Sequence, residues 1–529
     1  MLPSAHFHSA KQASEHEWDA IVVGAGMGGC AAAFALAKEG MQVLVIENGL
    51  AELTECADIS KHSDDAEDRA RMGRWPTRLS GKVDNKPFDF YAPLGTGVGG
   101  SSLLYAAALD RFRPSDFTAR AHPNGGTLQW PFNYEALVPY YEMAEDMMAI
   151  SGTADPLSDT PVALAEPDPL SPRDSDLFDR FAGAGLHPYL LHSGYRYSKE
   201  CGVCFGRVCL CGCKKHGGNS FFEPAVATGR VAVLSQTRVD RFDADADQVK
   251  SVYIIDNGTE TALSAKVFVL SAGTYFSPVL LLKSRSDAWP NGLGNHNDQV
   301  GRNLMFHTGR SLAVWARRGK SHHGGGKTLV FRDFYETPEG KFGEVQSTGA
   351  QASYGNVVYA LRQILATSAF AKVPLLWQLA RIPAFIASRF LGKAAVFELI
   401  MEDLPYPENR VTLDDAAPSG MRFDYQIQDE LRERFALFSR KVSKSLSKVH
   451  HIWLTHGVGL NYGHPMGTCR MGSDPKTSVA SADGRVHGLG NLYIADGAAL
   501  PSSGGTNPSL TIAACALRLG AIIAKRHHS

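Results

Sequence analysis

The chain has 529 residues and a formal net charge of −1, with 53 Lys and Arg residues against 54 Asp and Glu residues. This length exceeds what one compact core normally holds, so we expect two lobes. The balanced charge excludes an electrostatic reason for a nucleic-acid partner, and 44% hydrophobic residues with 52 glycines indicate a globular protein with many tight loops around a ligand.

Residues 1–17 are expected to form a flexible tail. They lack a basic stretch followed by an apolar core, so no signal peptide is recognised. The chain also lacks a run of about 18 uncharged apolar residues, the length that a spanning helix needs. We therefore expect a cytoplasmic protein.

Residues 18–49 predict a βαβ unit that binds a dinucleotide. A short apolar strand leads into closely spaced glycines, an Ala-rich helix follows, and a second strand ends the unit. Gly24 permits the tight turn, Gly26 lets the backbone approach a pyrophosphate, and Gly29 lets the helix pack closely on the strand. The phosphates are expected at the helix N-terminus, where unpaired N–H groups favour anions.

Glu47 closes the second predicted strand, 18 residues after Gly29. A carboxylate at this place can accept hydrogen bonds from the ribose hydroxyls of an adenosine and would repel a 2′-phosphate. The combination of strand, glycines, helix, strand and acid predicts a dinucleotide site, and it does not separate NAD from FAD.

Five of the nine cysteines lie within residues 201–213. In a chain without a recognised signal peptide, such a cluster favours metal binding over disulfides. The residue types suit an iron–sulfur cluster and zinc equally.

Residues 361–397 carry five basic and no acidic side chains among Leu, Ile, Phe and Trp. Pro374 and Pro383 divide this stretch, so it is not expected to span a membrane. The pattern suits an interfacial amphipathic segment that makes peripheral membrane contact, or the mouth of a cleft for apolar substrates. A helical pair packed on the rest of the protein is the alternative.

The C-terminal part carries two motifs, GHPMGTCRMG at 463–472 and NLYIADGAALPSSGGTNPSLTIAACAL at 491–517. They resemble the C-terminal signature of the glucose–methanol–choline (GMC) oxidoreductases. Further segments resemble the same family in the same order, so that the resemblance covers about residues 18–525; these segments are 94–105, 130–145, 267–284, 300–307 and 407–413.

The resemblance implies an α/β fold with a Rossmann-like FAD-binding domain assembled from discontinuous segments, and an α+β substrate-binding domain around an antiparallel sheet. We place the FAD-binding domain at 18–120, 200–305 and 455–525, and the substrate-binding domain at 121–199 and 306–454. The flavin would lie between the two.

The resemblance also implies the chemistry, which is oxidation of an alcohol or sugar hydroxyl by hydride transfer to flavin N5. His464 occupies the position of the family's catalytic histidine and is expected to act as the base. Asn507 stands where family members carry His or Asn, and its amide could donate to the substrate oxygen. Asn507 could also simply cap a helix at 508–523, with Pro508 in the first turn, and the two roles are compatible.

FAD is expected to bind non-covalently, because the segment after Gly99 and Gly100 contains none of the histidines that attach flavin in some family members. The resemblance implies cofactor contacts from the first glycine loop, the second glycine-rich segment and three later segments: Gly24, Gly26, Met27, Gly28, Gly29, Glu47, Gly97, Gly99, Gly100, Ser101, Val239, Ala272, Gly273, Asp496, Gly497, Asn507 and Pro508.

Residues 109–117 resemble the sugar and gluconate dehydrogenase-like branch of the family. Cys204, Cys209 and Cys213 have the spacing C-x4-C-x3-C, which resembles the segment of sugar dehydrogenases that carry an iron–sulfur cluster. Such a cluster would pass electrons to a cytochrome or quinone. Structural zinc, a disulfide and unliganded thiols remain alternatives.

Three further readings of the function remain open. The protein could be an oxidase that uses O2 on an alcohol or a sterol, a non-redox lyase or isomerase on the same fold, or a nucleotide-binding scaffold. The determinants of the substrate are expected within 306–454, which carries no transferable motif. Glu402 in this part is expected to form a structural salt bridge, with a substrate contact as the alternative.

Overall fold

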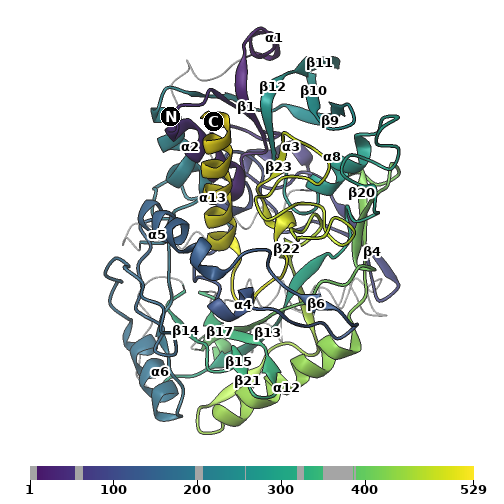
Figure 1. Cartoon of the computed structure of the whole chain (residues 1–529). Coiled ribbons are helices and arrows are strands. Elements are labelled where there is room, and N and C mark those ends of the chain that lie inside the picture. The colour runs from purple at the N-terminus through teal and green to yellow at the C-terminus, as the bar shows by residue number, and fades with distance from the viewer. Residues whose placement is uncertain are drawn as a thin grey trace.

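The computed structural model describes residues 9–53, 64–196, 206–256, 258–317, 327–349, 385, 389–392 and 394–528. Two main bodies are visible in Figure 1: a parallel sheet with the helices α2 and α13 in the upper half, and a large antiparallel sheet in the lower half. Among the described residues, no helix has the length and apolar character needed to cross a membrane.

The upper body is built on a five-stranded parallel sheet in the order β23-β12-β1-β2-β8. Its central strands are almost wholly buried, which explains their continuous apolar sequences. The strands are β1 (Trp18–Val23), β2 (Val43–Ile46), β8 (Val231–Leu234), β12 (Ala265–Leu270) and β23 (Leu492–Ile494).

Helix α2 (Met27–Lys38) follows β1 directly and packs against the long C-terminal helix α13 (Ser509–His528). The contact depends on small residues: a Cβ on Gly520 would lie 2.5 Å from Cβ of Ala35. The hydroxyl groups of Tyr141 and Thr511, 2.8 Å apart, link α5 (Val138–Met147) to α13.

Smaller elements surround this body. An antiparallel sheet in the order β11-β10-β9 flanks it (Figure 1). Other short elements are β9 (Arg238–Ala244), β10 (Val249–Asp256), β11 (Thr259–Leu263), α1 (Ala10–Ser14), α3 (Ala66–Arg71), α4 (Pro114–Phe117), α7 (Glu223–Ala227), α8 (Ser277–Lys283), β5 (Arg120–Ala121), β6 (Thr127–Leu128), a π-helical turn at Gly218–Phe222 and the 3-10 turns at Gly100–Leu103, Tyr134–Ala136 and Gly497–Ala499.

The lower body is a seven-stranded antiparallel sheet in the order β21-β13-β18-β17-β14-β7, with β22 also paired to β13. The strands are β7 (Tyr189–Leu190), β13 (Met305–Val314), β14 (Leu329–Phe331), β17 (Gly343–Ser347), β18 (Ala395–Met401), β21 (His451–Trp453) and β22 (Gly459–Met466). The short pair β15 (Glu336–Thr337) and β16 (Gly340–Lys341) lies beside it.

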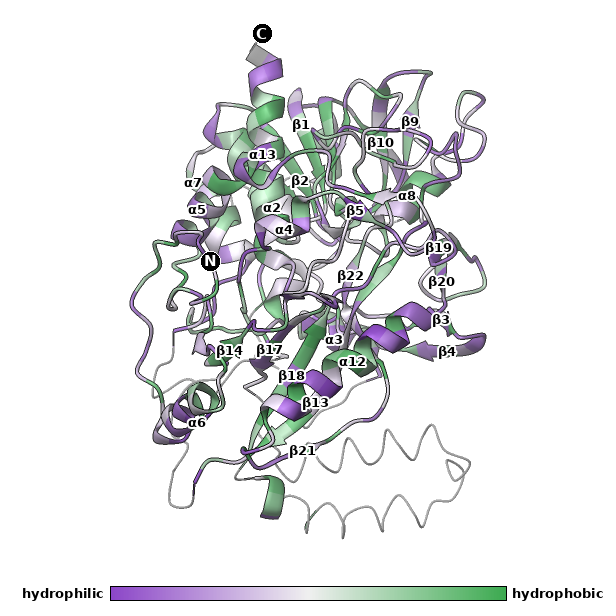
Figure 2. Ribbon diagram, turned by 60° about the horizontal axis from the view of Figure 1, so that its bottom comes forward, coloured by the Kyte–Doolittle hydropathy of each residue, from purple (hydrophilic) through white to green (hydrophobic). Residues whose placement is uncertain are grey.

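Two helices cover one face of this sheet, α6 (Pro172–Gly183) and α12 (Asp429–Ser445). Green hydrophobic and purple hydrophilic segments alternate along α12 in Figure 2, as expected for an amphipathic helix. Its apolar residues recur at helical spacing and pack with Leu312, Phe397 and Leu399 of the sheet; they are Leu431, Phe435, Phe438 and Val442. The other face of the sheet is thereby left for the functional site.

A four-stranded sheet in the order β19-β20-β3-β4 joins distant parts of the chain. Its strands are β3 (Leu79–Val83), β4 (Lys86–Phe90), β19 (Arg410–Leu413) and β20 (Met421–Tyr425). Contacts therefore cross the domain boundaries that the sequence suggests, and those boundaries stay a prediction. The α/β fold with an additional antiparallel sheet, which the sequence predicts, is confirmed.

Candidate active site

A cavity of about 1620 Å³ is lined by residues of both main sheets. It is larger than the usual pocket for one small molecule, which suits a large cofactor together with a substrate. Its wall includes Val23 and Ile46 at the ends of parallel strands, and Gln346, Glu398 and Ile400 of the antiparallel sheet.

The first glycine loop leaves open space at the N-terminus of α2. A Cβ on Gly26 would meet nothing within 4 Å, whereas a Cβ on Gly28 would lie 1.6 Å from Ala495 O and one on Gly29 would lie 1.9 Å from Gly24 O. Gly26 is the N-cap and makes no side-chain cap hydrogen bond. The loop thus presents free backbone N–H groups to the cavity, which fits a pyrophosphate.

Glu47 lies on the cavity wall and binds three backbone N–H groups. Its Oε2 accepts from Ala25 N at 2.9 Å, and its Oε1 accepts from Gly49 N at 2.8 Å and from Gly97 N at 3.0 Å. A carboxylate has about four acceptor sites, so one remains for a ribose hydroxyl. Glu47 therefore holds three loops together in addition to its predicted role.

The second glycine-rich segment lies against the first. Gly97 and Gly99 adopt φ values of +101° and +113°, which favour glycine, and a Cβ on Gly100 would lie 2.8 Å from Gly26 Cα. Gly100 and Ser101 line the cavity. The described cavity wall does not include Gly29, Gly97 or Gly99, which instead shape the loops.

The predicted contacts from later segments also lie on the cavity wall: Val239, Ala272, Gly273, Asp496, Gly497 and Pro508, with Met27 and Gly28 of α2. Asp496 is fixed by Gly273 N and Ala498 N, both at 2.8 Å, and by the Ser277 hydroxyl at 2.5 Å. Basic side chains on the same wall suit an anionic cofactor; they are Arg74, Arg207, Arg238 and Lys283. The residues present therefore fit FAD.

His464 on β22 and Asn507 before α13 both line the cavity. Asn507 Oδ1 accepts from Nε2 of Gln346 at 2.9 Å. The described residues give no capping hydrogen bond from the Asn507 side chain to α13, so the capping interpretation is not supported. With Oδ1 engaged, the amide N–H groups of Asn507 remain as donors toward the cavity.

His464 has a partner that the sequence did not reveal, His307 on β13. The Nδ1 atoms of the two rings lie 3.0 Å apart, and His307 Nε2 lies 3.0 Å from Ser503 O and 3.1 Å from Gly504 O. Carbonyl oxygens only accept hydrogen bonds, so His307 Nε2 carries the proton and its Nδ1 accepts. His464 Nδ1 must then donate, which leaves His464 Nε2 with a free lone pair.

Both imidazoles are held neutral. Burial lowers the pKa of His307 to about 4, and the hydrogen bonds to Ser503 and Gly504 oppose this shift only in part. Burial lowers the pKa of His464 well below its usual value, and the unfavourable interactions of a protonated His464 with His307 and Lys327 add to this shift. Near neutral pH, His464 is therefore able to accept a proton through Nε2.

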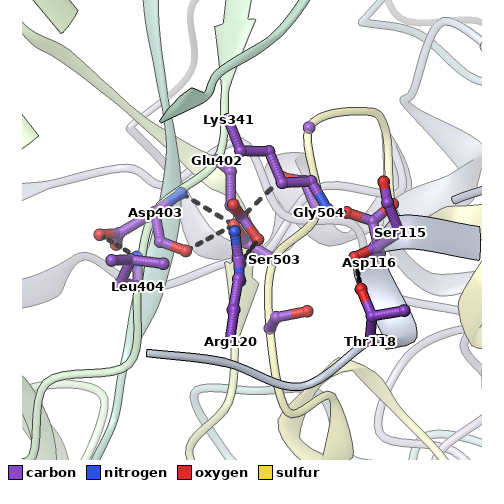
Figure 3. Close-up of polar contacts among 12 residues, drawn as sticks. Ser115, Asp116, Thr118, Arg120, Lys341, Glu402, Asp403, Leu404, Ser503 and Gly504 are labelled. Carbon is purple, nitrogen blue, oxygen red and sulfur yellow. Dashed lines mark hydrogen bonds and ion pairs between the residues drawn. The ribbon is translucent and has the colours of Figure 1, made fainter. Parts of the chain in front are cut away.

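A buried polar network holds the loop that orients His307 (Figure 3). The Ser503 hydroxyl accepts from Asp403 N at 2.9 Å and donates to Asp403 O at 2.9 Å. The neighbouring Glu402 is fully buried and ion-paired with Arg120. Burial raises its pKa, but Arg120 and Lys341 outweigh this effect and hold the pKa at about 2. Glu402 thus has the structural role expected from the sequence.

Of the predicted metal ligands, Cys204 lies outside the described residues. Cys209, Cys211 and Cys213 place their sulfur atoms within 4.8 Å of one another. The sequence had left Cys211 without a role. Lys214 Nζ, which follows directly, donates to Leu103 O at 2.8 Å and ties this loop to the second glycine-rich segment.

Besides His307, which lies behind His464, the sequence did not reveal three residues of the cavity wall: Lys327, Gln346 and Glu398. His307 ends the segment 300–307, which in the sequence carried only the family resemblance and no role for a histidine. The alternation of β18 (Ala395–Met401) could have placed Glu398 on a polar face, but only the pairing of strands brings it to the cavity.

Comparison with known proteins shows one family over most of the chain. The family models described as GMC oxidoreductase match residues 18–309 and 405–516. The chain is similar to paromamine 6'-oxidase of Streptomyces fradiae (27% identity, 96% of this chain and 91% of the relative) and to 2-methyl-1,2-propanediol dehydrogenase of Mycolicibacterium austroafricanum (28%, 97% and 96%).

The fold is also shared with a solved structure, pyridoxine 4-oxidase from Mesorbium loti, at a TM-score of 0.65 and 19% identity, over 97% of this chain and 100% of that one. The motifs, the fold and the cavity agree with the family models. The chain therefore belongs to the GMC oxidoreductases, FAD-dependent enzymes that act on alcohol and sugar hydroxyls.

Proposed function

We propose that the protein oxidises an alcohol carbon next to non-covalently bound FAD, with His464 as the base that removes the hydroxyl proton. The observation that carries the proposal is the 3.0 Å contact between His307 Nδ1 and His464 Nδ1. It leaves His464 Nε2 unprotonated on the cavity wall, as a base for a substrate hydroxyl must be.

The roles of His464 and Asn507 follow from the hydrogen-bond donors and acceptors that each presents to the cavity. His464 Nε2 takes the proton from the substrate hydroxyl, and the Asn507 amide donates a hydrogen bond to the substrate oxygen. As the C–H bond breaks with loss of hydride, the carbon and oxygen form a carbonyl group. FAD, when bound, supplies the acceptor for the two electrons of the hydride.

The helix dipole of α13 supports the same assignment. Pro508 lines the cavity and α13 begins at Ser509, so the helix N-terminus faces the cofactor site. Its partial positive charge would stabilise negative charge on a reduced cofactor. Because His464 acts as the base in this proposal, we expect its replacement to lower turnover while FAD is retained.

The electron acceptor distinguishes a dehydrogenase from an oxidase. A dehydrogenase would pass electrons to a cytochrome or quinone, and an iron–sulfur cluster on Cys204, Cys209 and Cys213 would serve that route. The grouping of Cys209, Cys211 and Cys213 is compatible with a thiolate-bound metal and alters the expected ligand set by including Cys211. Anaerobic purification with iron, sulfide and zinc analysis tests the cluster, and stopped-flow reoxidation by air tests the oxidase alternative.

Peripheral membrane contact through residues 361–397 is a separate proposal. Most of this segment lies outside the described residues, and of the part that is described, Phe385 and Phe390 are 55% and 70% exposed. Exposed aromatic and basic residues together suit an interfacial segment. Flotation with anionic liposomes at low salt tests the proposal, and absence of co-flotation would contradict it.

The experiment for the main proposal is anaerobic mixing of the yellow holoprotein with a panel of alcohols and sugars, read by flavin bleaching. Acid or heat should release free FAD into the supernatant. Colour that stays with the precipitated polypeptide would contradict non-covalent binding. Absence of bleaching with every alcohol would favour a non-redox role.

A further inference from the structure

The face of the large antiparallel sheet that lines the cavity carries two polar side chains beside the apolar Ile400. Gln346 on β17 pairs directly with Glu398 on β18, and side chains of directly opposed residues lie on the same face. Both line the cavity. Their neighbours Val345, Phe397 and Leu399 belong to the apolar cluster under α12 on the other face. The alternation of each strand thus delivers an amide and a carboxylate to the cavity.

The sheet makes room for the Glu398 carboxylate. On the adjacent strand β13, a Cβ on Gly309 would lie 2.8 Å from Glu398 Oε1, so the carboxylate occupies the space above this glycine. Within the described part of the chain, the Glu398 carboxylate makes no hydrogen bond or ion pair, whereas its backbone is part of the sheet. Burial raises the pKa of Glu398, and the charge of Lys327 opposes this shift.

Lys327, just before β14, supplies the opposite charge on the same wall. Burial lowers the pKa of Lys327, and the charge of Glu398 opposes this shift most strongly. The two groups do not form an ion pair in the described structure, so a gap remains between them. Lys327 and His464 line the same cavity, and the charge of Lys327 contributes to the lowered pKa of His464.

Gln346 connects these groups to the site of reaction. Its Nε2 donates to Asn507 Oδ1, while its Oε1 is buried and has no partner among the described residues. A buried acceptor without a partner costs free energy, which a ligand that donates to it would recover. The cavity therefore offers two acceptors and one cation beside the pair His464 and Asn507.

We propose that Lys327, Glu398 and Gln346 form a subsite for a second hydroxyl group, so that the substrate is an uncharged vicinal diol, polyol or sugar. A hydroxyl can accept from the ammonium and donate to the carboxylate at the same time. A cationic substrate group would meet Lys327 and an anionic one would meet Glu398, so the pair disfavours both. The inference rests on the proposed function, because it places the subsite beside His464.

Three small alcohols of the same skeleton test the turnover side: propylene glycol, n-propanol and alaninol carry a hydroxyl, a hydrogen or an ammonium group on the second carbon. We expect kcat/KM for propylene glycol to exceed the other two by about 10- to 100-fold, because a site built to bind a hydroxyl rejects compounds that leave it unpaired. Equal values for propylene glycol and n-propanol in the wild type would overturn the subsite.

Two variants locate the preference. Glu398→Gln and Lys327→Met should each reduce the preference for propylene glycol over n-propanol to within a few-fold. Lys327→Met should in addition favour alaninol, because the carboxylate then faces its ammonium without competition. Glu336→Gln, a change at an exposed carboxylate of β15, is the matched control and should leave the selectivity unchanged. Unchanged selectivity in both cavity variants would also overturn the assignment.

Pinacol separates the subsite from the chemistry, because it is a vicinal diol without a hydrogen on either carbinol carbon and cannot be oxidised. Thermal shift and flavin absorbance of the holoprotein measure its binding against the analogue that lacks one hydroxyl. Tighter binding of pinacol that is lost in Glu398→Gln supports the subsite even if no alcohol bleaches the flavin. Absence of bleaching would contradict only the proposed oxidation. Equal binding of the two compounds by the wild type would reject the subsite by itself.

Discussion

Replacement of His307 by Phe tests how the base is oriented. The Phe ring fills a similar volume but cannot accept a hydrogen bond from His464 Nδ1. Asn461 Nδ2 lies 3.4 Å from the same nitrogen and would then donate to it, favouring the tautomer with the proton on Nε2. That tautomer cannot take the proton from the substrate.

The size of the effect follows from the buried N–H group. Leaving His464 Nδ1–H without an acceptor costs about 1–3 kcal/mol. Since 1.36 kcal/mol corresponds to a factor of ten, the active tautomer and hence kcat should fall by about 5- to 150-fold. FAD content should be unchanged, because His307 does not line the cofactor cavity.

The conservative variant separates orientation from packing. In His307→Gln, the amide oxygen can accept from His464 while the amide nitrogen donates to Ser503 O or Gly504 O, so turnover should be largely restored. Anaerobic flavin reduction under saturating alcohol measures kcat for both variants. Full turnover in His307→Phe, or an equal loss in both variants, would refute the tautomer argument.

Three further predictions concern pH, cofactor binding and folding. The lowered pKa values of His307 and His464 predict that kcat/KM stays level as pH falls through 6.5 and declines only in more acidic solution. The free energy of unfolding should fall between about pH 6.5 and 4, because the unfolded state binds the protons first. A pH profile of kcat/KM and denaturant titrations measure the two effects, and a decline of kcat/KM centred at pH 6.5 would contradict the assignment. Gly26→Ala should weaken FAD binding about tenfold or more without changing apoprotein stability. Gly28→Ala should instead destabilise the apoprotein, because its Cβ would lie 1.6 Å from Ala495 O. Fluorescence titration with FAD and thermal melts separate the two effects, and equal behaviour of the variants would contradict a pyrophosphate position at Gly26. Arg120→Met should lower the free energy of unfolding by about 3–5 kcal/mol, because it leaves the fully buried Glu402 without its ion-pair partner. Arg71→Met, which breaks the exposed pair with Glu67, is the control and should cost about 1 kcal/mol or less. Similarly small losses for both variants in denaturant unfolding would refute the importance of the buried pair.

The sequence predicted the features that local patterns encode. The βαβ unit gave the positions of Gly26 and Glu47 because strand, turn and helix are set by neighbouring residues. The family resemblance then identified His464 and Asn507, which lie far from these residues in the chain. Their place on one cavity wall agrees with that expectation, while their roles stay predictions.

The partners of those residues could not be predicted, because they come from strand register. His307 is 157 residues from His464, and Gln346 is 161 residues from Asn507. A shift of one residue in the pairing of β17 and β18 would turn Gln346 or Glu398 to the apolar face. The hydrogen bonds of Glu47 to backbone N–H groups of three loops could not be predicted either, because they depend on how these loops meet in the fold, and its ribose contact stays a prediction.

The most direct test of the central claim is anaerobic reduction of the bound flavin by an alcohol in the wild type and in His464→Ala. The account predicts bleaching in the wild type and a rate lower by about 10²- to 10⁴-fold in His464→Ala, the usual contribution of a positioned base. The FAD content of the two proteins should be equal. Reduction of His464→Ala at the wild-type rate, with its FAD retained, would contradict the claim.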